Sequence, residues 1–196
     1  HFSSFMSYTE MMVEHLYNMS IQEIQEMAVE MKKSAFNLYN LLENLLEWSR
    51  MQSGLTSFVH SPFLLKPKIS ESMALVLQAA SKKEIEISYL IPEDLIVDAD
   101  ANMLNSVVRN LASNAIKFSN KGGTISLNAR PLNSDYVEIS IRDTGIGMSK
   151  DLIRKLFKLT KETCRIGTEG EPSTGLGLLL CKGFIEKHGG QIWAES

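Results

Sequence analysis

The sequence has few cysteines, no long hydrophobic run and no excess of basic charge. Its two cysteines, Cys164 and Cys181, are too few for a disulfide framework and fit a reducing compartment, and no Cys/His spacing indicates zinc. Lys and Arg total 20 against 23 Asp and Glu, so the net charge of −3 argues against a general nucleic-acid-binding protein. The longest apolar runs, around 74–77 and 176–181, are too short to cross a bilayer, and no secretory signal is visible. We therefore expect a globular protein that contacts neither nucleic acid nor membrane.

Residues 2–51 contain neither glycine nor proline. That absence favours long helices, because these two residues are the least compatible with a helix interior. Apolar residues at helical spacing predict a first helix from Phe2 to about Asn18. Ser20 and Glu23 form a capping box, in which each side chain accepts from the other residue's backbone N–H, so a second helix should start there.

The second helix carries the clearest hydrophobic period in the chain. Its apolar positions, separated alternately by four and three residues, form an a/d heptad stripe that is interrupted by Ser34 and widened by Leu42 and Leu46. The stripe consists of Met27, Met31, Leu38, Leu41, Leu45 and Trp48. A single hairpin cannot bury so wide a stripe, so we expect two hairpins to dimerise into a four-helix bundle. The alternative is a hairpin that packs on its own C-terminal domain.

Helices and strands alternate after the hairpin, so we assign residues 1–54 to a helical hairpin and 55–196 to a second domain. Pro62 and Pro67 predict irregular chain at the start of the second domain. The pattern predicts helices at 69–80, after Asp100, after Ser149 and at 176–188, and strands at 85–89, 124–130, 136–142 and 191–193. This order predicts an α+β fold in which helices cover one face of a mixed sheet.

Three polar residues of the helix after Asp100 share one face. Asn110, Asn114 and Lys117 are spaced by four and three, beside an apolar stripe that contains Leu111 and Ala115. Amide oxygens are hard neutral ligands suited to Mg²⁺, and lysine suits phosphate. The alternative is an ordinary solvated helix face.

Two glycine-bearing segments follow. Asp143-Thr-Gly145-Ile-Gly147 comes after an alternating strand, and its carboxylate, which only accepts hydrogen bonds, could hold an exocyclic amine such as that of adenine. Asp and Gly are also routine turn residues. Gly175-Leu176-Gly177 leads into a helix whose free N–H groups favour phosphate, although it lacks the G-K-[ST] of a P-loop. The long polar run over 157–174 is typical of a mobile lid.

The order and spacing of these segments resemble the N box and the two glycine boxes of sensor histidine kinases. This family shares its ATP-binding superfamily, called GHKL, with gyrase, the MutL repair proteins and the ninety-kilodalton heat-shock chaperone. Leu45-Leu-Glu-Trp48-Ser-Arg-Met51 resembles the end of the kinase dimerisation hairpin, and Lys187-His188-Gly189-Gly190 resembles the strand entry near the end of the ATP domain. The resemblance covers essentially the whole chain. It implies a dimeric hairpin followed by an α/β sandwich of the GHKL type.

The resemblance also implies the ligands, ATP and Mg²⁺, and the residues that bind them. Asn110 and Asn114 would meet Mg²⁺ and phosphate, with Asn114 the better candidate for the metal, and Lys117 would contact phosphate. Asp143 would recognise the adenine amine. The remaining assignments are Phe118 beside adenine, Gly145 and Gly147 in the pocket floor, Phe157 in the phenylalanine box, and Gly175, Leu176 and Gly177 along the triphosphate.

By this resemblance the chain is the cytoplasmic catalytic core of a two-component kinase. It would transfer the γ-phosphoryl group of ATP to a histidine on the hairpin, from which a receiver-domain aspartate of a response regulator takes it. The family's acceptor histidine is followed by an acidic residue, whereas His1 is followed by Phe2-Ser3-Ser4-Phe5 and His15 has no such signature, so no catalytic residue is assigned. Compared with the family, we expect the hairpin to be N-terminally incomplete and the ATP domain to be C-terminally short.

Two alternative functions follow from the same residues. A phosphatase or scaffold form would bind ATP and a response regulator without autophosphorylation. A gyrase-like or chaperone-like ATPase would need an acidic general base where Asn110 stands. His188, at a predicted helix C-terminus, would be favourable there as a cation.

Overall fold

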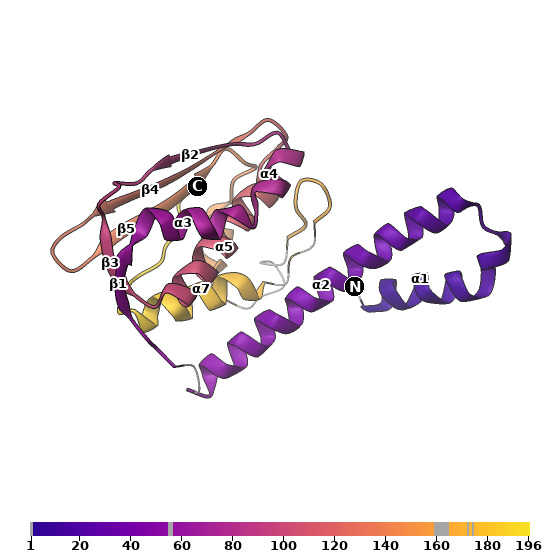
Figure 1. Cartoon of the computed structure of the whole chain (residues 1–196), viewed down its shortest axis with the longest axis horizontal. Helices are drawn as coiled ribbons and strands as arrows, with labels where there is room; N and C mark the ends of the chain where they lie inside the picture. Colours follow the sequence, from indigo (N-terminus) through magenta and orange to yellow (C-terminus); the bar gives the residue numbers. More distant parts are fainter. Residues whose placement is uncertain (1, 55–56, 159–164, 172, 174) are drawn as a thin grey trace. The chain divides into compact units, whose positions relative to one another are not determined.

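The computed structural model describes residues 2–54, 57–158, 165–171, 173 and 175–196 (Figure 1). The chain divides into two compact units, His1–Arg50 and Met51–Ser196. No helix in these described stretches is both long and apolar enough to span a membrane.

The first unit is a helical hairpin. It consists of α1 (Phe2–His15), the 3-10 turn η1 (Leu16–Asn18) and α2 (Ile21–Gln52), whose last two residues lie in the second unit. The predicted capping box is confirmed: Ser20 N donates to Glu23 Oε2 at 2.8 Å, and Glu23 N donates to Ser20 Oγ at 3.3 Å. Gly54, two residues after the end of α2, has φ of 68°, a left-handed backbone that favours glycine.

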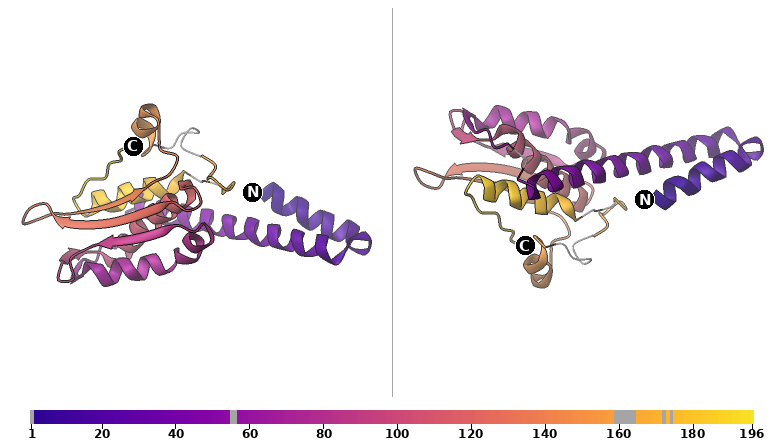
Figure 2. Two further views of the ribbon diagram at one scale, coloured as in Figure 1. Left: turned by 90° about the horizontal axis from the view of Figure 1, so that it is seen from above. Right: turned by 90° about the horizontal axis from the view of Figure 1, so that it is seen from below.

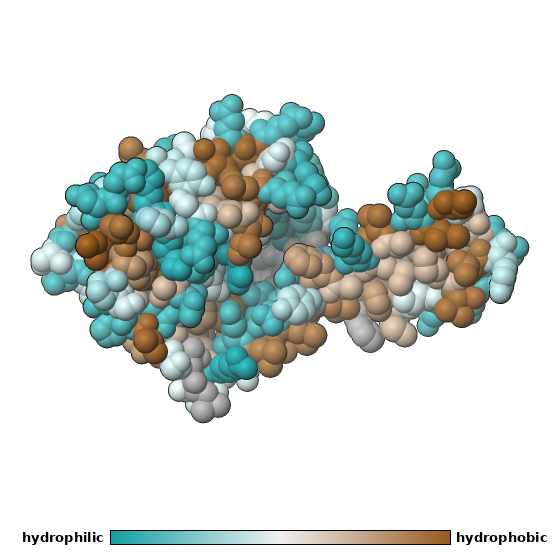
Figure 3. All heavy atoms as spheres, viewed as in Figure 1, coloured by the Kyte–Doolittle hydropathy of each residue, from teal (hydrophilic) through white to brown (hydrophobic). Residues whose placement is uncertain are grey.

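Most apolar side chains of the hairpin are exposed within one chain. Met27 and Ser34 are the buried residues of α2, whereas Leu42 and Leu46 are 58% and 54% exposed. In the space-filling view, brown apolar atoms cover much of the visible face of this hairpin (Figure 3). The heptad stripe is therefore only partly covered by α1.

The second unit carries both sheets. Its elements are β1 (Ser61–Leu64), α3 (Leu65–Ala74), α4 (Leu77–Lys82), β2 (Glu86–Leu90), β3 (Ile96–Ala99), α5 (Ala101–Phe118), β4 (Thr124–Pro131), β5 (Val137–Asp143), α6 (Lys150–Lys155) and α7 (Leu176–Lys187). In the larger sheet, β4 is central, parallel to β2 and antiparallel to β5, and β1 pairs antiparallel with β3 in the smaller one. Helices α3, α5 and α7 lie along one face of the larger sheet (Figures 1 and 2). The predicted α+β fold with a mixed sheet is confirmed.

The core lies between the larger sheet and the helices. Ile125 and Leu127 point inward from β4 and are at most 1% exposed, as the alternation of the strand predicts. They belong to one cluster with Val108 and Ala112 of α5 and Ile69 of α3. Because α5 packs on both α3 and α7, it holds a central place among the helices.

The region before β2 differs from the prediction in two ways. The single helix predicted over 69–80 is split into α3 and α4, because Val76 N donates to Met73 O in a tighter turn. Pro62 and Pro67 were wrongly assigned to irregular chain. Pro62 lies in β1 of a two-stranded sheet, and Pro67 lies in the first turn of α3, where a backbone N–H has no helical partner to lose.

The strand predicted at 191–193 is wrong. Residues 188–196 follow α7 without strand structure, and Trp193 is 56% exposed. Three alternating residues do not make a strand without a partner, and β5 pairs with β4 alone among the described strands.

The start of α5 and the end of α7 are joined through Asp100 and His188. Asp100 Oδ1 accepts from Asn102 N and Met103 N, as a predicted cap should, and its Oδ2 accepts from Val59 N at 3.0 Å. His188 Nε2 accepts from Asp100 N at 2.9 Å, so its Nδ1 carries the hydrogen that it donates to Phe184 O at 2.7 Å. The imidazole is thus a neutral bridge, which corrects the expectation of a cation.

Candidate functional site

The polar face of α5 borders its buried face. Asn110, Asn114 and Lys117 are all half-buried, whereas Ala112 and Ala115 between them are buried. The hydrophobic stripe of α5 against the sheet therefore fixes the direction in which the two amides and the ammonium lie.

The first turn of α7 lies against Asn110. A Cβ atom added to Gly177 would sit 2.9 Å from Asn110 Oδ1, so a larger residue there would require the Asn110 side chain to move. Gly175 precedes the helix with φ of 72°, in the left-handed region that side chains rarely adopt. Leu176 is buried and holds the first turn in place.

The turn after β5 lies against the other end of α5. Ile146 N donates to Phe118 O at 3.1 Å, and a Cβ on Gly145 would sit 2.4 Å from the same oxygen. Asp143 Oδ1 accepts from Gly145 N at 2.9 Å, and the Asp143 carboxylate remains exposed. Gly147 has φ of 64°, which glycine adopts freely. Because the backbone of Gly145 lies against Phe118 O and also donates to Asp143 Oδ1, Asp143 is held near the end of α5.

The segment 165–171 covers the same end of α5. The Arg165 guanidinium lies 5.5 Å from the Phe118 ring centroid and donates to Gly147 O at 3.2 Å. Lys117 Nζ lies 5.2 Å from that centroid. Two cations therefore face one aromatic ring at distances typical of cation–π contacts.

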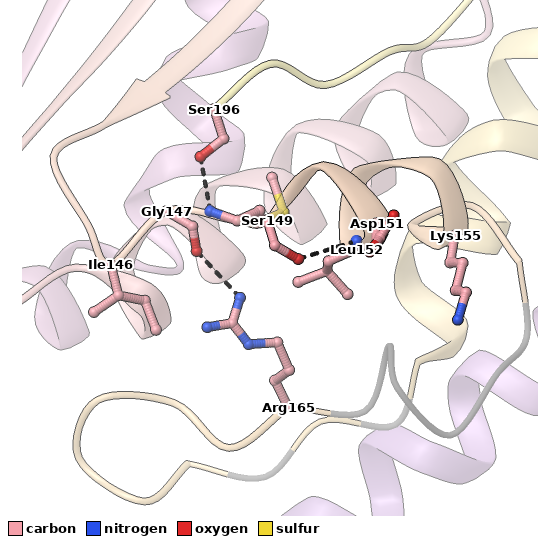
Figure 4. Close-up of a pocket in the computed structure, with 9 residues that line it drawn as sticks. Ile146, Gly147, Ser149, Asp151, Leu152, Lys155, Arg165 and Ser196 are labelled. Carbon is pink, nitrogen blue, oxygen red and sulfur yellow. Dashed lines mark hydrogen bonds between the residues drawn. The ribbon is translucent and has the colours of Figure 1, made fainter.

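A cavity of about 670 Å³ lies beside this turn (Figure 4). Apolar atoms of Ile146, Met148 and Leu152 line it together with the polar side chains of Asp151 and Arg165. Its size suits a small-molecule ligand. Of the predicted site residues that the structure describes, Gly147 alone lines this cavity, so it adjoins the α5 face rather than coinciding with it.

Not every predicted residue joins this arrangement. Asn110 contacts the start of α7, and Phe118 contacts the turn after β5 and Arg165. Phe157 is half-buried in the turn after α6 and takes part in none of the contacts described above. Of the predicted lid over 157–174, residues 159–164, 172 and 174 lie outside the described residues.

Sequence reasoning missed two cations of this region, Arg165 and Lys83. Lys83 is 3% exposed, whereas its neighbour Lys82 is exposed. The burial of Lys83 could have been predicted from its position in the sequence. Lys83 lies three residues after Ala80 and two before Ile85, and both of these residues are buried. Nothing in the residues around Arg165 indicates that it reaches Phe118.

The donors on α5 fit a magnesium ion that is held mainly by phosphate. No group of three His, Cys, Asp or Glu side chains gathers as a metal site in the described part of the chain. Asn110 and Asn114 instead offer neutral amide oxygens, and Mg²⁺ commonly takes few protein ligands beside substrate phosphates and water.

Comparison with known proteins places this arrangement in a family. Residues 99–196 match the family described as histidine kinase-, DNA gyrase B- and HSP90-like ATPase. The chain is 32% identical over 173 residues to the sensor protein GacS of Pseudomonas syringae pv. syringae, a match over 84% of this chain and 19% of that protein. The chain therefore spans about a fifth of the length of this relative.

Solved structures of histidine kinases agree with this family assignment. The catalytic domain of the histidine kinase ThkA has a TM-score of 0.60 at 30% identity, covering 69% of this chain and 86% of that one. ThkA in complex with the response regulator TrrA shares the fold over 98% of this chain and 52% of that one, with a TM-score of 0.75 at 23% identity. The chain belongs to the histidine kinase-, gyrase B- and HSP90-like ATPase family, and it carries a catalytic domain of the sensor histidine kinase type. Membership of this family implies ATP binding.

Proposed function

We propose that this chain is the catalytic core of a two-component sensor histidine kinase that binds ATP with Mg²⁺. The observation that carries the proposal is the convergence of glycine backbone on α5, with Gly177 against Asn110 and Gly145 against Phe118. Close backbone approach leaves N–H groups facing a ligand, and α5 supplies two amides and an ammonium beside them.

Each residue has a distinct role in this proposal. Asn114 and Asn110 hold the magnesium ion, which offsets phosphate charge when it is bound. Lys117 and the start of α7, with Gly175, Leu176 and Gly177, bind the phosphates. The remaining residues form the base pocket: Asp143 accepts from the adenine amine, Phe118 lines the adenine pocket, and Gly145 and Gly147 form the floor. Phe157 stands in the phenylalanine box.

The reaction is a transfer of the γ-phosphoryl group. The bond from the γ-phosphorus to the β–γ bridging oxygen breaks, ADP leaves, and a phosphorus–nitrogen bond forms to an imidazole that gives up its N–H proton. A response-regulator aspartate then attacks the phosphorus: a bond forms from its carboxylate oxygen to the phosphorus, the phosphorus–nitrogen bond breaks, and the imidazole nitrogen takes back a proton. The complex of ThkA with TrrA supports a response regulator as the partner.

The hairpin supports this proposal as the dimerisation element. Leu42, Leu45 and Leu46, which are exposed in one chain, fit a four-helix bundle with a second copy. His15, exposed at the end of α1 with Nε2 3.9 Å from Glu14 Oε2, is the acceptor candidate on the described hairpin, while His1 lies outside the described residues.

The adenine assignment is tested by nucleotide binding to Asp143→Ala. We expect the variant to lose measurable binding of a non-hydrolysable ATP analogue in calorimetry while it unfolds in urea like the parent. Asp135→Ala is the matched control, because Asp135 lies in the exposed hairpin turn at the far end of β5. Unchanged affinity in Asp143→Ala would remove adenine recognition from this residue.

Phosphorylation separates the kinase from the phosphatase or scaffold alternative. The chain is incubated with γ-labelled ATP and Mg²⁺, and the label is then challenged with acid and with alkali. An acid-labile, alkali-stable label that is lost in His15→Ala identifies His15 as the acceptor, and one that persists points to His1. Nucleotide binding without label supports the phosphatase or scaffold form.

A further inference from the structure

Lys83 is a buried lysine at the end of α4. Its side chain is 4% exposed, which is rare for lysine unless its charge is paired. The ammonium donates to Ile116 O at 3.2 Å, to Lys117 O at 3.1 Å and to Thr168 Oγ1 at 2.8 Å. Two of these three acceptors are backbone carbonyls at the end of α5.

The carbonyl groups of Ile116 and Lys117 belong to the last turn of α5. The last carbonyls of a helix have no partner within the helix and form the negative end of its dipole, so a buried ammonium there is favourable. Lys83 therefore caps the helix that carries Asn114 and Lys117. It does so from a different part of the chain, since Lys83 precedes β2.

The same ammonium holds the segment that precedes α7. Lys83 Nζ lies 2.6 Å from Glu171 Oε1, and Glu171 Oε2 accepts from Glu169 N at 2.8 Å. Burial raises the pKa of Glu171, but the hydrogen bonds from Lys83 and from backbone N–H groups outweigh it, so the net pKa lies below the usual value of 4.5. Glu171 is thus held as the anion that pairs with Lys83.

Thr168 completes the attachment. Its N–H donates to Lys117 O at 3.0 Å, and its hydroxyl donates to Ser119 O at 2.8 Å. Gly167, directly before it, lies so close to Lys117 that an added Cβ would sit 2.6 Å from Lys117 Cγ. We call Lys83, Thr168 and Glu171 the Lys83 clasp.

We propose that the Lys83 clasp positions the approach to α7 for the terminal phosphate of the nucleotide, with Lys83 as a positioning residue. Gly175 follows Glu171 by only four positions, so fixing Glu171 on the end of α5 restricts where α7 begins. The clasp thereby holds Lys117 and the start of α7 together before the nucleotide arrives, which lowers the ordering cost of binding. This inference rests on the proposed ATP site.

The test compares two nucleotides rather than one. Adenine recognition at Asp143 is common to ADP and to a non-hydrolysable ATP analogue, whereas the γ-phosphate is present only in the second. We expect Lys83→Met and Glu171→Gln to weaken binding of the ATP analogue about tenfold, the loss typical of one charge-assisted hydrogen bond, and that of ADP less than about twofold. A general loss of stability would reduce both affinities alike, so the ratio of the two reports positioning.

Matched controls are available on both sides of the clasp. Lys82→Met changes the exposed lysine next to Lys83, and Glu169→Gln changes an exposed carboxylate of the same segment. Both should keep the parental affinity ratio. Glu171→Gln, at the partly exposed end of the pair, tests the clasp if Lys83→Met does not fold.

The outcomes are distinct. A selective loss for the ATP analogue in Glu171→Gln and Lys83→Met supports the clasp. If the parent binds both nucleotides and Glu171→Gln leaves the ratio of the two affinities unchanged, the proposed role of the clasp is wrong and the proposed function stands. If the parent binds neither nucleotide, the proposed function is wrong, and so is the proposed role of the clasp.

Discussion

The two units of this chain bury their apolar residues to very different extents. In the 32-residue helix α2, Met27 and Ser34 are the buried residues, whereas eight residues of the 18-residue helix α5 are buried. Both helices have an apolar stripe at helical spacing. The difference lies in what surrounds the two helices. Helix α5 packs on β5, α3 and α7, whereas the helix that runs beside α2 in its own unit is α1 (Figure 1). A stripe that one chain leaves open points to burial by a second copy.

The largest effect that we expect concerns the hairpin. The double change Leu42→Glu and Leu46→Glu would place two charges in the interface of the proposed four-helix bundle, and charges without partners are strongly unfavourable there. We expect the variant to be monomeric in light scattering under conditions where the parent is a dimer. Glu43→Lys, on an exposed position between them, should stay dimeric. Persistence of the dimer in the double variant would contradict the bundle.

The next effect contrasts the same substitution in both units. Leu127→Ala removes a side chain that is 0% exposed at the centre of β4, so we expect the second unit to lose about 2–5 kcal/mol of unfolding free energy. Leu42→Ala changes a side chain that is 58% exposed in one chain, and the transition of the second unit should move by no more than about 0.5 kcal/mol. Urea unfolding followed by a probe in each unit measures both. Equal shifts would mean that the two units unfold together.

The smallest effect concerns the two helix caps. Asp100 accepts three backbone N–H groups, so Asp100→Ala should destabilise the second unit by about 1–2 kcal/mol at neutral pH. Burial raises the pKa of Asp100, but the hydrogen bonds that its carboxylate accepts from the backbone N–H groups of Val59, Met103 and Asn102 outweigh burial, so the net pKa is lowered from 3.8.

That shift fixes the direction of the pH dependence. A carboxyl with a lowered folded-state pKa stabilises above its unfolded value of 3.8, and this contribution is lost as the pH falls through the lower folded value. The stability difference between parent and Asp100→Ala should therefore narrow below pH 3.8. Ser20→Ala, at the exposed cap of α2, should leave the transition of the second unit unchanged. A difference that is independent of pH would show that the charge of Asp100 does not matter.

Local patterns predicted most elements because each pattern has a local cause. The Ser20–Glu23 capping box, the helices after Asp100 and after Ser149 and the two strands predicted at 124–130 and 136–142 all occur in the structure. The wrong predictions concern features that depend on partners. Gln191–Trp193 alternates but has no neighbouring strand in the described chain, and Pro62 is tolerated because β1 belongs to a sheet of only two strands.

The candidate site divides in the same way. The spacing of Asn110, Asn114 and Lys117 indicates a shared helix face, since helical periodicity needs no tertiary information. The sequence could not indicate that Arg165 would lie over Phe118, or that Lys83 rather than Lys82 would be buried, because these contacts join segments far apart in the chain.

The sequence by itself therefore determined the Ser20 and Asp100 helix caps and the placement of Asn110, Asn114 and Lys117 on one helix face, because capping and periodicity act over a few residues. Only the tertiary structure decided that His188 is a neutral hydrogen-bond bridge to Asp100 and that Lys83 joins the end of α5 to Glu171. The protonation of a histidine and the burial of a lysine depend on which distant donors and acceptors surround them, and folding alone brings those groups together.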